Sequence, residues 1–394
     1  MKIVAITLAL VLISSAPAAA AAARYQCNKE ETHEHPNHCH LMDMAATQPQ
    51  QLANELHAWA KDIGFVIPSV DNSGVTAMKR NLRLGGATSS DSESDSVGSL
   101  PTVMAHGMGD SCFNGGMQSI TNRVATITGQ YATCIPTGDN LHDDTLNGYF
   151  MSMDANIDAF AEKVQADATL SKGFHAMGLS QGNNVIRGYI AKYNDPPVHT
   201  FISINGVNAG IGAVPYCIPK YDEVIDMNTK EEQPRAVKGK ICDALMEIAS
   251  HKAYSEFSQT HSFQANYWRD PRPTEKENYQ KYSQLAQIGN EGLKHDLTLN
   301  DNFAKTQKFV WVLATQDNMI WPREGEQWGA PNPDAADPFN DVLPMKETEW
   351  YESDSFGLKS ADVAGKHHFE QFDGDHLQFS MDDFDSWVQT YLVV

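Results

Sequence analysis

Short apolar runs alternate with amphipathic segments along most of the chain. Runs typical of buried strands occupy residues 100–105, 173–178, 200–204 and 308–314. Apolar residues that recur every three or four positions predict helices over residues 117–127, 154–168 and 183–192 and from about residue 380. Strands that alternate with helices favour an α/β fold with a mostly parallel central sheet, here over residues 99–394. The helix-rich, aromatic span of about 213–300 is predicted to be an insertion, or lid, over that sheet.

The first 98 residues have a different character. Lys2 precedes the apolar run from Ile3 to Ile13, and small residues follow as far as Ala23. This pattern predicts a secretory signal peptide over residues 1–23. A membrane anchor is the alternative, but crossing a bilayer requires about 20 apolar residues. Residues 24–98 are predicted to be an N-terminal extension, with a helix at about 41–66 and a polar, low-complexity linker at 85–96.

Charge narrows the set of partners. The 394-residue chain has 29 Lys and Arg against 50 Asp and Glu, a formal net charge of −21 at pH 7. Such a surface repels phosphate backbones and offers no broad basic face to anionic lipids, so nucleic acid is not expected as a partner. No second long apolar stretch follows the predicted signal peptide, so no integral membrane segment is expected in the mature chain. The oligomeric state is left open.

Cysteine usage agrees with secretion. Six cysteines follow the predicted signal peptide, which indicates disulfide bonds in an oxidising compartment. The spacing favours pairs of neighbours: Cys27 with Cys39, Cys112 with Cys134, and Cys217 with Cys242. Histidines surround the first pair and could complete a zinc or copper site. A small disulfide loop is favoured there, and no metal or other cofactor is expected.

A candidate nucleophile lies between a predicted strand and a predicted helix. Gly178-Leu179-Ser180-Gln181-Gly182 has the G-x-S-x-G pattern, and its strand–turn–helix context is that of a nucleophile elbow. The glycines allow the sharp turn that projects the Ser180 hydroxyl above the sheet edge. An ordinary turn between strand and helix is the alternative.

A serine nucleophile requires a base and an acid that orients it. Asp317 follows the strand at 308–314, and His376 lies in a loop between a strand end at Gln371-Phe372 and the last helix, which gives the chain order Ser, Asp, His usual for this elbow. An Asx turn is the alternative for Asp317. The competing residues are Asp337, Asp341, Asp362, His367 and His368.

An acyl intermediate also requires donors for its oxyanion. The backbone N–H of Gln181, directly after the serine, is one candidate. The loop His106-Gly107-Met108-Gly109 follows an early strand, and the Met108 N–H is the second candidate. A simple glycine turn is the alternative for this loop.

Four stretches together resemble the lysosomal palmitoyl-protein thioesterases. They are HGMGDSC from His106, AMGLSQG from Ala176, QANYWRDP from Gln264 and EQFDGDHLQ from Glu370, and the resemblance runs from about Leu100 to the C-terminus. It implies an α/β-hydrolase that cleaves long-chain acyl thioesters of palmitoylated proteins or peptides. It also implies a triad of Ser180, Asp317 and His376, oxyanion donors at Met108 and Gln181, and a disulfide between Cys217 and Cys242.

Two other functions remain open from the sequence. A lipase or carboxylesterase acting on acyl oxyesters would use the same triad, and a non-catalytic lipid-binding protein would need none of it. Apolar residues of the predicted insertion could line an acyl groove or could be ordinary core: Ile218, Ala244, Leu245, Ile248, Tyr254, Phe257, Phe263, Tyr267 and Trp268.

Overall fold

The structure is a computed structural model. It describes residues 100–213, 253–339 and 341–393, together with the isolated residues Lys29, Asp43 and Thr47. Several predictions lie outside the described residues: the signal peptide, the helix at 41–66, the linker at 85–96, the cysteine pairs 27/39 and 217/242, the histidine cluster, and Ile218, Ala244, Leu245 and Ile248.

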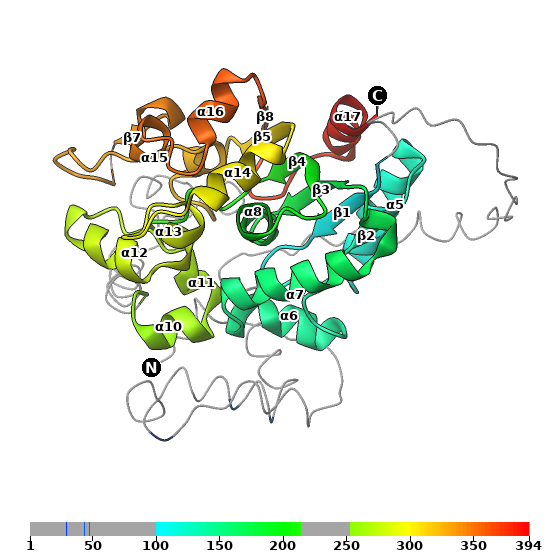
Figure 1. Ribbon diagram of the computed structural model, residues 1–394, viewed down its shortest axis with the longest axis horizontal. Coiled ribbons are helices and arrows are strands. Elements are labelled where there is room, and N and C mark those ends of the chain that lie inside the picture. The colour runs from blue at the N-terminus through cyan, green and yellow to red at the C-terminus, as the bar shows by residue number, and fades with distance from the viewer. Residues whose placement is uncertain are drawn as a thin grey trace, which may run out of the picture.

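A parallel sheet forms the centre of the described structure (Figure 1). Its strands are β1 (Thr102–Ala105), β2 (Ala132–Cys134), β3 (Phe174–Leu179), β4 (Val198–Ile204), β5 (Lys308–Ala314) and β8 (His367–Phe372). Within the described residues the order is β2-β1-β3-β4-β5-β8, and every neighbouring pair is parallel. The predicted α/β class and all four predicted strands are confirmed, and the predicted strand end before His376 is the end of β8, whereas β2 was not predicted.

Helices cover both faces of this sheet. They are α5 (Gly115–Thr128), α6 (Leu141–Phe150), α7 (Met153–Ala166), α8 (Gly182–Lys192), α14 (Leu297–Lys305) and α17 (Met381–Leu392). The α5 and α17 helices lie side by side on one face, while α7, α8 and α14 pack together on the other (Figure 1). The four predicted helices correspond to α5, α7, α8 and α17, with ends displaced by one or two residues.

Two separate apolar layers result from the alternation of side chains along each strand. In β5, Phe309 and Trp311 point into the layer that contains α7, α8 and α14, whereas Val310 and Val312 point toward α5 and α17. All four are fully or almost fully buried. A strand with both faces covered reads as a continuous apolar run, which is why KFVWVLA was recognisable in the sequence.

The predicted insertion is partly described. Its helices are α10 (Glu256–His261), α11 (Phe263–Asn266), α12 (Lys276–Tyr282) and α13 (Gln284–Ile288), with the 3₁₀ helix η6 (Pro273–Glu275). Tyr254, Phe263, Tyr267 and Trp268 are all buried within the main core, which is the ordinary role that the sequence left open for them. That this span acts as a lid stays a prediction, as do the domain boundaries.

The C-terminal part adds small elements around β5 and β8. They are the 3₁₀ helices η7 (Arg323–Gln327) and η8 (Met345–Glu347), the helices α15 (Glu349–Glu352) and α16 (Leu358–Val363), and the antiparallel strands β6 (Ala330–Pro331) and β7 (Val342–Leu343). A further 3₁₀ helix, η4 (Ala168–Leu170), lies between α7 and β3. The η7 helix follows β5 and carries Glu326 into the interior.

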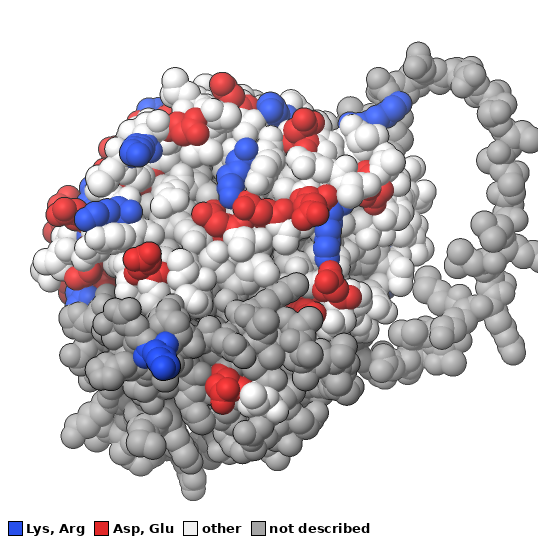
Figure 2. All heavy atoms as spheres, turned by 60° about the horizontal axis from the view of Figure 1, so that its bottom comes forward, with Lys and Arg blue, Asp and Glu red and all other residues white. Residues whose placement is uncertain are grey.

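The surface is polar and predominantly acidic. On the face in Figure 2, acidic side chains are spread over the described surface, and basic side chains are scattered among them. Among the described residues, no helix combines the length and apolar character needed to cross a bilayer.

Candidate active site

Ser180 occupies a sharp turn between β3 and α8. Its φ is 51°, in the left-handed region that a residue with a Cβ seldom adopts. The turn is held by the Ser180 N–H, which donates to the Ile204 carbonyl on β4 at 3.0 Å. Two residues later, a Cβ on Gly182 would lie 2.4 Å from the Ala105 carbonyl oxygen, so only glycine allows α8 to approach β1 this closely. The local geometry is that of a nucleophile elbow.

Asp317 and His376 meet Ser180 at the carboxyl edge of the sheet. Asp317 follows the end of β5, His376 follows β8, and parallel strands end at the same edge. His376 Nε2 lies 2.8 Å from Ser180 Oγ, and His376 Nδ1 lies 2.6 Å from Asp317 Oδ2. The three side chains therefore form one continuous chain of hydrogen bonds.

Asp317 is held as a carboxylate. Its side chain is fully buried, and its Oδ1 accepts hydrogen bonds from the N–H groups of Met319 (2.7 Å) and Ile320 (2.8 Å). Burial works to raise the pKa of Asp317, but the interaction with His376 and these hydrogen bonds outweigh it, so the pKa lies below its ordinary value. A buried carboxylate at Nδ1 fixes the tautomer in which Nε2 can accept a proton from Ser180.

The competing residues have other partners. Asp341 accepts from Asn332 at 2.7 Å, Asp337 accepts from the Phe339 N–H at 2.9 Å, and Asp362 accepts from the Tyr351 hydroxyl at 2.6 Å. His367 Nδ1 accepts from the Trp311 indole at 2.9 Å, and the His368 ring packs 5.3 Å from that of Tyr391. The hydrogen-bonded chain to Ser180 contains none of these five residues.

The two candidate oxyanion donors belong to segments that adjoin Ser180. Met108 lies in the loop after β1, and an added Cβ on its neighbour Gly107 would come within 3.2 Å of the Ser180 Cβ. The loop thus passes directly beside the serine.

Gln181 is anchored by its side chain. Its Nε2 donates to the Gly148 carbonyl at 2.8 Å, and its Oε1 accepts from Gln264 Nε2 at 2.9 Å. Gln264 also donates to the Gly148 carbonyl at 2.8 Å. Gln264 begins the QANYWRDP stretch, so that stretch helps to fix the residue after the serine.

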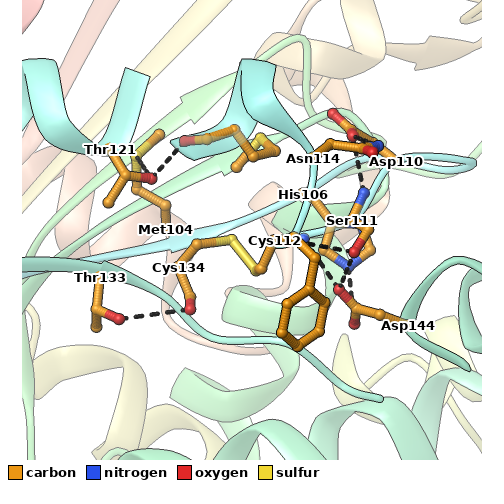
Figure 3. Close-up of a disulfide and its surroundings, with 12 residues drawn as sticks. Met104, His106, Asp110, Ser111, Cys112, Asn114, Thr121, Thr133, Cys134 and Asp144 are labelled. Carbon is orange, nitrogen blue, oxygen red and sulfur yellow. Dashed lines mark hydrogen bonds and ion pairs between the residues drawn. A yellow bond between two sulfur atoms is a disulfide. The ribbon is translucent and has the colours of Figure 1, made fainter. Parts of the chain in front are cut away.

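A buried ion pair supports the loop after β1 (Figure 3). His106 Nε2 lies 3.2 Å from Asp144 Oδ1, and both side chains are buried. Burial works to lower the pKa of His106, but Asp144 outweighs it and raises the pKa to about 9. Burial likewise works to raise the pKa of Asp144, yet His106, Ser111 and a backbone donor lower it to about 2. Both groups are therefore charged at neutral pH.

A disulfide bond closes the same loop onto β2. Cys112 and Cys134 are joined with their Cα atoms 5.4 Å apart, as the spacing of neighbouring cysteines predicted (Figure 3). The Cys112 N–H also donates to Asp144 Oδ2 at 2.9 Å. The backbone between His106 and Cys112 is thus fixed at both ends.

His106, Cys112 and Asp144 are also close enough together to be considered as a metal site, with ligand atoms within 4.8 Å of one another. The chemistry of the three groups does not fit a metal, because the Cys112 sulfur is in a disulfide and the imidazole is already paired with the carboxylate.

Two buried carboxyl groups near the site were missed by the sequence reasoning. Asp144 lies in the first turn of α6, and Glu326 lies in η7 behind Asp317. Both stand among other polar residues in the sequence, so no apolar pattern indicated their burial. The only available signal for Asp144 was its place near a helix N-terminus, where acidic residues are common.

Comparison with known proteins identifies the family of this chain. A sequence model of the palmitoyl protein thioesterase family matches residues 101–376. Palmitoyl-protein thioesterase 1 of Caenorhabditis elegans is 30% identical over 71% of this chain and 87% of its own length. Palmitoyl-protein thioesterase 3 of Dictyostelium discoideum is 27% identical over 72% and 87%. A lysosomal thioesterase of Xenopus laevis is 28% identical over 49% of this chain and 59% of its own length. The chain belongs to the palmitoyl-protein thioesterase family of hydrolases.

Proposed function

We propose that this protein hydrolyses long-chain fatty acyl thioesters, and that it removes palmitoyl groups from cysteine side chains of lipid-modified proteins or peptides. The observation that carries the proposal is the hydrogen-bonded chain from Ser180 through His376 to Asp317, with distances of 2.8 and 2.6 Å. The family assignment and the names of the relatives supply the substrate class.

In the proposed acylation step, the Ser180 hydroxyl attacks the thioester carbonyl carbon while His376 Nε2 takes the hydroxyl proton. The tetrahedral intermediate collapses, the carbon–sulfur bond breaks, and the proton on His376 passes to the departing sulfur. The products are an acyl ester on Ser180 and a free thiol. Asp317 keeps the imidazole oriented and stabilises its charged form throughout.

The oxyanion of the intermediate would be held by the backbone N–H groups of Met108 and Gln181. The support is indirect: Gly107 brings the first loop against Ser180, and the Gln181 side chain is fixed through Gly148 and Gln264. Removing one donor of an oxyanion hole typically lowers the rate by about 10²–10³.

Deacylation uses the same residues in reverse. His376 takes a proton from a water molecule, which attacks the acyl carbon, and then returns the proton to Ser180 Oγ as the fatty acid leaves. The hydrolysis thus consumes one water for each thioester and requires no cofactor in the proposed mechanism.

The test compares wild-type protein with Ser180→Ala on a palmitoyl thioester and on a matched palmitoyl oxyester. The control is Ser171→Ala, an exposed serine in the turn that precedes β3. We expect thioester turnover to fall by about 10³ or more in Ser180→Ala and to be unchanged in the control. Retained binding of the acyl substrate by Ser180→Ala would show that the substitution affects chemistry only.

Each other result has a defined meaning. Turnover that survives in Ser180→Ala would contradict the assignment of the nucleophile. A preference for the oxyester would leave the triad in place and move the protein to the lipase or carboxylesterase class. Binding of both substrates without turnover by the wild type would support a lipid-binding protein.

We also propose that the protein acts in the lysosome or outside the cell. A lysosomal thioesterase is among its relatives, and the Cys112–Cys134 disulfide suits an oxidising compartment. Fractionation of cells that express the full chain would test this, and recovery in the cytosol with reduced cysteines would contradict it.

A further inference from the structure

A second carboxyl group is buried directly behind Asp317. Glu326 lies in η7, and its side chain is completely inaccessible to solvent. Its Oε2 accepts hydrogen bonds from Asn205 Nδ2 at 2.8 Å and from the Ala314 N–H at 3.0 Å. Its carboxyl group is within hydrogen-bonding reach of the Asp317 carboxyl. Among the described residues, no donor reaches its other oxygen, Oε1.

The surrounding chain holds Glu326 in this position. Gln327, the next residue, donates to the carbonyls of Trp311 (3.0 Å) and Glu370 (2.9 Å), which ties η7 to β5 and β8. Trp328 then turns into the core and packs edge-to-face on Trp311, with ring centroids 5.4 Å apart. The Glu326 side chain therefore cannot swing away from Asp317 without disrupting this packing.

Two adjacent buried carboxyl groups cannot both be ionised, because the repulsion between them is not screened by water. Asp317 is the carboxyl group of the pair that is ionised, because it faces His376 and two backbone N–H donors. Among the residues that the structure describes, no cation acts on Glu326, and Asp317 is the charged group that does. Burial first, and then the Asp317 charge, raise the pKa of Glu326 well above its ordinary value.

We propose that Glu326 is a protonated carboxylic acid that donates a hydrogen bond from Oε1 to the Asp317 carboxylate, and that it is a positioning residue for the catalytic histidine. This inference rests on the proposed function of Asp317 and His376. A neutral acid serves this role better than a carboxylate, because it supplies a donor to Asp317 without adding a second negative charge behind the imidazole.

Asn205 extends the same network to the histidine loop. Its amide nitrogen donates to Glu326 Oε2, while its Oδ1 accepts from the Leu377 N–H at 3.0 Å. Leu377 directly follows His376 and has a positive φ of 56°, so this bond stabilises an unfavourable backbone conformation. Glu326 thus reaches the imidazole of His376 by two routes. It contacts Asp317 directly, and it is connected through Asn205 to the loop that carries His376.

The decisive comparison is between Glu326→Gln and Glu326→Leu. Glutamine keeps a neutral group with a donor for Asp317 and an acceptor for Asn205, whereas leucine removes both. Glu324→Gln is the matched control, because Glu324 is exposed on the same η7 helix. For each variant, kcat and KM for an acyl thioester are measured across the pH range, and thermal unfolding is recorded.

We expect Glu326→Gln to stay within about 3-fold of wild-type kcat and to keep the acid limb of the pH profile in place. We expect Glu326→Leu to lower kcat by about 10- to 100-fold with little change in KM. Its acid limb should move to higher pH by about 0.5–1 unit, because Asp317 loses a donor and stabilises the imidazolium more strongly. A purely structural role would lower stability without moving the pH profile.

Infrared spectroscopy tests the proton directly and does not depend on activity. We expect the wild-type spectrum at neutral pH to contain a carbonyl stretch of a protonated carboxylic acid that is absent from Glu326→Gln and present in Glu324→Gln. If Glu326→Leu does not fold, this spectrum and the Glu326→Gln profile still decide the question.

Three results would overturn the inference: no such infrared band, an acid limb displaced to lower pH in Glu326→Gln, or a Glu326→Leu enzyme with normal kcat and pH profile. Inactivity of the wild type on every acyl substrate would instead count against the proposed function, and the infrared result would then show separately whether the buried acid is protonated.

Discussion

The buried ion pair between His106 and Asp144 should contribute to the stability of the fold, and the structure allows the size of that contribution to be calculated. Asp144 is fully buried and accepts four hydrogen bonds of 3.1 Å or less, and it makes one ion-pair contact at 3.2 Å, with partners from three separate segments. Its Oδ2 accepts from Ser111 Oγ (2.8 Å) and the Cys112 N–H (2.9 Å), and its Oδ1 accepts from the N–H groups of residues 137 (2.7 Å) and 138 (3.1 Å) and faces His106 (3.2 Å). The perturbation is Asp144→Asn, which keeps the shape and removes the charge.

The expected loss of stability is about 3–5 kcal/mol, the usual cost of leaving one partner of a buried ion pair alone. The pKa shifts of the two residues correspond to free energies of similar size. Asp144 falls from 3.8 to about 2 and His106 rises from 6.5 to about 9, which correspond to about 2 and about 3 kcal/mol. Asparagine also turns an N–H₂ group toward buried donors, so at least one backbone N–H is left without an acceptor, at about 1–3 kcal/mol.

Denaturant unfolding of wild type and Asp144→Asn measures this loss. Asp139→Asn is the matched control, because Asp139 is 78% exposed and lies 3.8 Å from Lys163 in a surface ion pair. Its removal should change the stability by less than about 1 kcal/mol. We also expect Asp144→Asn to lower kcat, since the network fixes the loop that carries the proposed Met108 donor.

The reasoning would be refuted by an Asp144→Asn protein that is as stable as the Asp139→Asn control. That result would mean that His106 is neutral in the folded protein and that the loop is held by the disulfide and backbone alone. A protein that is destabilised but has normal kcat would keep the energetic argument and contradict the link from this network to the oxyanion donor.

Three further predictions follow from the same geometry. Asp317→Asn should lower kcat by about 10⁴ without unfolding the protein, because an amide stabilises the wrong tautomer of the imidazole; steady-state kinetics with a melting curve test this, and a loss below about 10-fold would contradict it. Replacing Cys112 and Cys134 by alanine should lower the unfolding free energy by about 3 kcal/mol for a sequence separation of 22. An unchanged denaturant midpoint would show that this disulfide bond does not stabilise the fold. The stabilisation from His106 should be complete below pH 6.5 and disappear as the pH rises toward 9, since its pKa is higher in the folded state; unfolding at several pH values would show this decline, which should be absent from Asp144→Asn.

The sequence by itself determined the fold class and the order of the candidate catalytic residues. Strands buried on both faces, such as β5, appear in the sequence as continuous apolar runs, and helices appear as apolar residues that recur every three or four positions. Parallel strands end at one edge, so Ser180, Asp317 and His376, each placed just after a predicted strand, were expected to meet. The short strand β2 has only three half-buried residues and left no such pattern.

Only the tertiary structure decided which polar groups support these residues. Asp144, Glu326 and Gln264 resemble surface residues in the sequence, because burial of a polar side chain depends on partners that come from other segments. His106 gains its charge from a carboxylate on α6, and Glu326 is expected to keep its proton because it is buried beside Asp317, which follows β5. Local sequence sets periodicity and turns, whereas protonation and hydrogen bonding inside the protein are set by contacts between distant segments, and these exist only after the sheet has assembled.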